Sequence, residues 1–105
     1  TIHNDAPIVP PDMMRLLWIT VNRKTRSGFV LGAEQRATPL QALHAITLGA
    51  AYQYFEEDQK GSITPGKRAD LVVLGANPLT VDPDMIKDIP IIETFARGKS
   101  VYRRP

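Results

Sequence analysis

Gly61-Ser62-Ile63-Thr64-Pro65-Gly66-Lys67-Arg68-Ala69-Asp70-Leu71-Val72-Val73-Leu74 places a tight turn directly before a strand. Pro65 presets φ for the first central position of a turn and Gly66 takes positive φ without steric cost, the order of a type II turn. The apolar run 71–74 is rich in β-branched residues, which predicts a strand covered on both faces. Between turn and strand, the Asp70 carboxylate is expected to accept backbone N–H groups, in preference to a catalytic role.

Residues 61–74 resemble the G-S-I-x-x-G-K-x-A-D-L-V-V-L motif near the C-terminus of amidohydrolase-superfamily enzymes. The resemblance implies a metal-dependent hydrolase built on a (β/α)8 barrel with a small β-sandwich beside it. The motif would belong to the sandwich and perform no chemistry. Residues 91–102 resemble the closing V-x-x-T-x-x-x-G-x-x-V-Y of the family, and predict a strand over 91–96, a hairpin tip at Gly98-Lys99 and a strand over 100–102.

Length and composition limit the classes of protein that this chain can represent. Its 105 residues fall well short of the roughly 250 of a complete (β/α)8 barrel. No apolar run approaches the ~18 residues of a membrane span, and a net charge of +2 spread over small basic groups gives no nucleic-acid-binding stripe. The lack of cysteine excludes disulfides and thiolate metal sites, and fits a cytoplasmic location. Because the chain opens on Thr1 without an initiator methionine or signal peptide, we expect it to be part of a longer protein.

Residues 1–7, TIHNDAP, predict the end of a strand running into a loop, with Ala6 held extended by the proline after it. On sequence alone Asp5 is a turn former. The family resemblance implies more, because in amidohydrolases an aspartate at the end of the eighth barrel strand binds metal and takes a proton from the attacking water. Asp5 matches that aspartate. His3 would lie on the same side of an extended strand, as a partner supporting the metal ligand or as a structural histidine.

Two helices are predicted in the first half of the chain. The first runs from about residue 12 to 24, and its buried face has the helical spacing of Met14, Leu17, Trp18 and Val21. The second runs from Thr38 to about residue 54 and starts with a capping box that Gln41 completes. Its apolar face is expected to comprise Leu40, Leu43, Thr47, Ala50, Ala51 and Tyr54.

The remaining segments give weaker signals. His44 has no second ligand at i±3 or i±4, so a metal role is poorly supported, and no role can be assigned to Arg23. Residues 25–37 are predicted to form a loop, and residues 81–86 a loop with at most one helical turn. Asp82 and Asp84 are expected to form turns beside a proline.

The expected fold class is therefore an α+β part of a larger protein. Residues 1–57 would be the end of the metal-dependent hydrolase barrel, namely the end of its last strand and the helices after it. Residues 58–105 would be C-terminal strands of the small composite β-sandwich.

Two functions are compatible with the sequence. In the first, the chain is the C-terminal part of a metal-dependent amidohydrolase of the amidohydrolase-3 branch, similar to N-substituted formamide deformylases and D-aminoacylases. The parent would bind a divalent metal, Zn²⁺ by family resemblance, and a small amide-type substrate, whereas the isolated chain would bind no metal tightly and would be inactive. In the second, it is an independently folded, non-catalytic interaction or oligomerisation module. Without the barrel strands, both helices should expose apolar faces, so we expect contact with the rest of the barrel or self-association.

Overall fold

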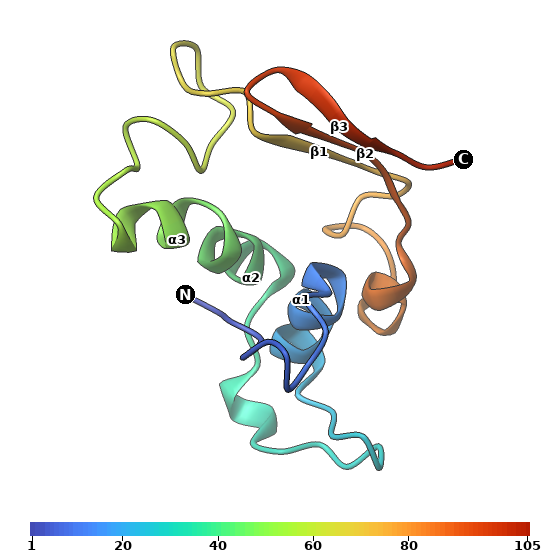
Figure 1. Cartoon of the computed structure of the whole chain (residues 1–105). Coiled ribbons are helices and arrows are strands. Elements are labelled where there is room, and N and C mark those ends of the chain that lie inside the picture. The colour runs from blue at the N-terminus through green and yellow to red at the C-terminus, as the bar shows by residue number, and fades with distance from the viewer.

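A computed structural model describes residues 1–105 as a group of helices with an antiparallel sheet above it (Figure 1). The helices are α1 (Met13–Asn22), α2 (Pro39–Ile46) and α3 (Leu48–Gln53), with 3-10 turns η1 (Ala33–Gln35) and η2 (Pro83–Asp88). The strands are β1 (Leu71–Leu74), β2 (Ile91–Ala96) and β3 (Lys99–Arg103), in sheet order β1-β2-β3. Each helix is too short or too polar to cross a membrane.

The turn at residues 64–67 and the strands after it form as the sequence predicts, with a shift at the hairpin. Lys67 N donates to Thr64 O at 3.1 Å and Gly66 has φ +92°, which confirms the turn at Pro65 and Gly66. The β2-β3 turn lies at Arg97 and Gly98, because Lys99 already pairs with Ala96 in the ladder. The predicted tip at Gly98-Lys99 is therefore wrong by one residue.

The burial predicted for β1 is wrong. Leu71, Val72 and Val73 are 37%, 53% and 44% exposed. β1 is an edge strand of a three-stranded sheet, and a hollow separates it from α3. Only Leu74, at the end of the apolar run, is partly buried and packs against the core.

The core lies where α1 packs against η2 and α2. Met14, Leu17 and Val21 of the predicted α1 face are buried, and Trp18 packs against them. Ile86 and Ile89 of the η2 region complete the cluster with Ala42 of α2. The expectation of a bare apolar face on α1 is therefore wrong, because the segment predicted to be a loop folds into a six-residue 3-10 turn that covers it.

Polar groups fix the ends of α1. Asp12 accepts a hydrogen bond from Arg15 N at 3.0 Å as N-cap, and Arg23 ends the helix in the left-handed region at φ +51°. Its Nε donates to Leu31 O at 2.6 Å, which folds residues 24–30 into a short hairpin with a bridge between Lys24 and Val30. The loop predicted over 25–37 thus contains ordered structure, and Arg23 has a structural role here.

The predicted second helix is broken into two. Its capping box is confirmed, since Gln41 N donates to Thr38 Oγ1 at 3.2 Å and Thr38 N donates to Gln41 Oε1 at 2.8 Å. Thr47 departs from helical geometry at ψ −95°, which separates α2 from α3. The predicted face is confirmed in part, because Ala51 is buried and Leu43 packs against the core, but Leu40 and Tyr54 are exposed and Ala42, outside the predicted face, is buried.

Gly61 packs against the junction between α2 and α3. A Cβ added there would lie 2.8 Å from the Cβ of Ala51 and 3.1 Å from the carbonyl oxygen of Thr47. Small residues at positions 49–51 allow this approach of a second backbone. The contact joins the start of the 61–74 segment to the helices.

We expect Gly61→Ala to lower the free energy of unfolding more than Gly66→Ala. Both glycines have φ near +90°, so the substitutions share the same backbone strain, but nothing lies within 4 Å of a Cβ at Gly66. The difference between the two losses in free energy therefore measures the clash of the added methyl group with the junction between α2 and α3. Overpacking of this kind costs about 1–3 kcal/mol. Urea unfolding of both variants measures it, and equal losses would show that the junction relaxes around the added methyl group.

Candidate functional site

The N-terminal segment that carries the candidate aspartate is a turn, not a strand. Residues 1–4 pair with no other backbone, since the sheet is built only from residues 71–103, and the predicted strand end is wrong. Asp5 has φ +53°, and Ile8 N donates to its carbonyl oxygen at 2.9 Å. The Asn4 side chain donates to Pro10 O at 3.1 Å and holds the turn against the start of α1.

The structure confirms the turn-forming role of Asp5. Because Asp5 is left-handed, the side chains of His3 and Asp5 do not share one face of an extended strand, and that prediction is wrong. Both residues are exposed. The Asp5 carboxylate makes no ion pair with any cation of the chain. It is thus free to accept a proton or to contact a group supplied from elsewhere.

Residues 1–105 do not make up a metal site. Nowhere do three side chains of His, Cys, Asp or Glu gather within reach of one ion. A zinc site requires three or four protein ligands, and Asp5 supplies one carboxylate at most. The donor set present in this chain therefore does not fit the metal that the family resemblance implies.

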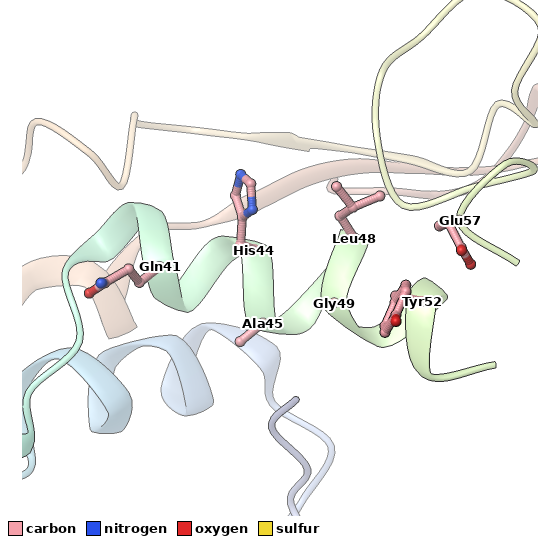
Figure 2. A pocket seen from close by; sticks show the side chains of 7 residues that line it. All are labelled: Gln41, His44, Ala45, Leu48, Gly49, Tyr52 and Glu57. Atoms are coloured by element: carbon pink, nitrogen blue, oxygen red, sulfur yellow. The ribbon is translucent and has the colours of Figure 1, made fainter. Parts of the chain in front are cut away.

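His44 lies on α2, where it lines an open hollow of about 440 Å³. Figure 2 shows His44 and Leu48 projecting on the same side of the two helices. The hollow is lined by Gln41, His44, Ala45, Leu48, Gly49, Tyr52 and Glu57. One oxygen of Glu57, Oε2, is buried without a hydrogen-bond partner. The sequence signal that could have indicated this hollow was the i, i+4, i+8 spacing of His44, Leu48 and Tyr52. Neither His3 nor Asp5 lines the hollow.

Asp70 has the structural role that the sequence predicts, with a partner far along the chain. Its Oδ1 accepts the Arg97 backbone N–H at 2.8 Å, and its Oδ2 accepts Arg68 Nε at 2.7 Å. These two hydrogen bonds, the first above all, hold the pKa of the Asp70 carboxyl below its ordinary value. Asp70 ties the approach to β1 to the β2-β3 turn.

The carboxylates of Asp82 and Asp84 also have structural partners within the chain. Asp82 Oδ1 accepts Asp84 N at 2.9 Å, which confirms the predicted turn and caps η2. The Asp84 carboxylate pairs with Lys24 at 2.5 Å and links η2 to the hairpin after α1. Neither is arranged for acid–base chemistry.

Comparisons with known proteins identify the family of this chain. The Amidohydrolase family model of the amidohydrolase-3 branch matches residues 1–102. The chain belongs to this family. Among curated amidohydrolase relatives, the N-substituted formamide deformylase of Arthrobacter pascens is 27% identical over 104 residues, covering 99% of this chain and 19% of that protein. The putative amidohydrolase YtcJ of Bacillus subtilis is 29% identical over 104 residues, covering 96% of this chain and 20% of that protein.

A solved structure of an amidohydrolase also resembles this chain. The crystal structure of an amidohydrolase from Thermotoga maritima superposes with a TM-score of 0.69 at 25% identity, over 95% of this chain and 22% of that one. This chain therefore spans about one fifth of the length of the amidohydrolase relatives that match it throughout.

Proposed function

We propose that the chain is the C-terminal portion of a metal-dependent amidohydrolase that hydrolyses an amide-type carbon–nitrogen bond. The observation that carries the proposal is the family match over residues 1–102, joined to a coverage of only 19% and 20% of the two relatives matched from end to end. The name of one relative, a deformylase of N-substituted formamides, supports a small amide as substrate. We further propose that the isolated chain is inactive, and the lack of any group of three potential metal ligands within it supports this.

We also propose a division of the chain between two parts of the parent, which would share the core where α1 packs against η2. Residues 1–57 contain the helices, and we assign them to the end of the (β/α)8 barrel. Residues 58–105 contain the sheet, and we assign them to the small β-sandwich. The likeness to the amidohydrolase of Thermotoga maritima is consistent with both assignments.

Asp5 is the residue of this chain that we assign to the chemistry. Its carboxylate is exposed, free of ion pairs, and displayed by a turn of its own backbone. A carboxylate so placed can accept a proton from water and return it to a leaving nitrogen, the role of a general acid–base group. The divalent metal implied by the family, Zn²⁺ by resemblance, would take its other ligands from parts of the parent outside residues 1–105, and His3 would support Asp5 there.

The rest of the parent is the partner that we assign to the exposed apolar side chains at the end of α3 and after it. Tyr52, Tyr54, Phe55 and Ile63 are all exposed. Clusters of this kind on a protein surface mark contacts with other protein elements. In the parent they would face the remainder of the barrel.

The test is the full-length gene product that contains this sequence, compared with the purified 105-residue chain. We expect a mass several times the 11.7 kDa of this chain, about one or two bound divalent ions, and amide hydrolysis that a chelator abolishes. The short chain should show none. A gene product no larger than this chain would favour an interaction module, and hydrolysis by the short chain would refute the assignment of the missing ligands.

A further inference from the structure

Asp5 has a backbone conformation that needs support from its surroundings. Its φ of +53° lies in the left-handed region, which residues other than glycine adopt infrequently. Such conformations persist where neighbouring contacts hold them, and they concentrate at functional sites. The hydrogen bond from Ile8 N to Asp5 O closes the turn, but both of its ends belong to the turn. It does not connect Asp5 to the rest of the fold.

The side chain of Asn4 makes that connection. Its Nδ2 donates to the carbonyl oxygen of Pro10 at 3.1 Å, and the same oxygen accepts the backbone N–H of Asp12 at 2.7 Å. Asp12 is the N-cap of α1, whose Leu17 is fully buried in the core. The Pro10 carbonyl therefore joins the turn at Asp5 to the buried part of the chain.

This link has no substitute elsewhere in the N-terminal segment. The bond from Asn4 is the one hydrogen bond between residues 1–9 and residues 10–105. Asn4 is half-buried, whereas His3 and Asp5 on either side of it are exposed. Because Asn4 is bonded covalently to Asp5, an anchored Asn4 side chain limits how far the backbone of Asp5 can shift or rotate.

We propose that Asn4 is a positioning residue, which holds the Asp5 carboxylate at the place from which it exchanges a proton. This inference rests on the role proposed above for Asp5 in amide hydrolysis. A misplacement of about 1 Å can cost about a hundredfold in the rate of an enzyme, so the anchoring of a reacting group matters. An amide suits this task because it donates a hydrogen bond without a charge that would change the proton affinity of the adjacent carboxylate.

The kinetics of Asn4→Ala in the full-length protein test the proposal, with one small amide as substrate for every variant. We expect kcat to fall by about tenfold to a hundredfold, less than for Asp5→Asn because the carboxylate remains. KM should change by less than about twofold, since Asn4 would act in the transition state only through Asp5. Asn77→Ala is the matched control and should retain kcat. It also removes one side-chain hydrogen bond to backbone, from Leu79 N to Asn77 Oδ1 at 2.9 Å, in a segment outside the turn at Asp5.

The double variant Asn4→Ala with Asp5→Asn separates positioning from a structural role. If Asn4 acts through the Asp5 carboxylate, Asn4→Ala should lower kcat by less than about twofold once that carboxylate is gone. A structural role would give the same factor in both backgrounds. Should Asn4→Ala fail to fold, Asn4→Ser allows the same comparison, because its side chain stays polar but is shorter and lacks the amide.

The outcomes distinguish this inference from the proposed function. Undiminished kcat of Asn4→Ala beside a lowered kcat of Asp5→Asn would overturn the positioning role and leave the role of Asp5 in place. Equal factors for Asn4→Ala in the two backgrounds would overturn it as well. Undiminished kcat of Asp5→Asn would instead refute the proposed role of Asp5, and the positioning role would fall with it.

Discussion

Leu17→Ala is expected to lower the free energy of unfolding by about 2–5 kcal/mol. Leu17 is fully buried where α1 meets η2 and α2, and it touches the same cluster as Ile86. Only 10 of 105 residues are buried, so this cluster is small and each member carries a large share of the stability. Urea unfolding followed by the fluorescence of Trp18, which packs against the cluster and is the only tryptophan, measures the loss.

Leu31→Ala is the matched control, because Leu31 is 57% exposed on the hairpin after α1. Its effect should stay within about 0.5 kcal/mol. If Leu17→Ala proves unfolded in buffer, Ile86→Val makes a smaller cavity, with an expected cost of about 0.5–1.5 kcal/mol. A Leu17→Ala variant as stable as Leu31→Ala would show that the contact between α1 and η2 does not hold the fold.

Features that depend on neighbours in sequence were predictable. The turn at Pro65 and Gly66, the capping box of Thr38 and the buried face of α1 each result from residues within one or two turns of backbone. Their signals come from allowed φ values, local hydrogen-bond donors and helical periodicity. These forces act whether or not the rest of the chain is folded.

Features that depend on contacts between distant parts of the sequence could not be predicted. Ile86 covers Leu17 from about seventy residues along the chain, and nothing in the pattern around residues 81–86 indicates that partner. The break at Thr47 coincides with the approach of Gly61, which periodicity cannot reveal. The exposure of β1 results from its place at the sheet edge, whereas its composition indicates only that it is a strand.

The candidate site was predictable only in part. An aspartate before Ala-Pro predicts a turn, and the structure confirms one at Asp5. The strand expected before it fails because no other segment of the described chain offers it hydrogen bonds. The catalytic role of Asp5 rests on family resemblance, so it remains a proposal that the full-length protein must test.

Asp5→Asn in the full-length protein is expected to lower kcat for amide hydrolysis by about 10²–10⁴-fold. The substitution removes the group that we assign to proton transfer and leaves the shape of the side chain nearly unchanged. Asparagine also tolerates the left-handed conformation that Asp5 adopts at φ +53°. The turn that closes with Ile8 should therefore persist, and the loss can be attributed to the carboxylate.

Asp58→Asn provides the comparison, since Asp58 is also an exposed aspartate and is not a residue of the turn at Asp5. It should retain the kcat of the unmodified protein, and both variants should keep its melting temperature. Undiminished hydrolysis by Asp5→Asn would remove Asp5 from the chemistry and leave it as a turn former. A fall in melting temperature with a proportional fall in active protein would instead assign Asp5 to folding, because a proton-transfer group can be lost without cost to the native structure.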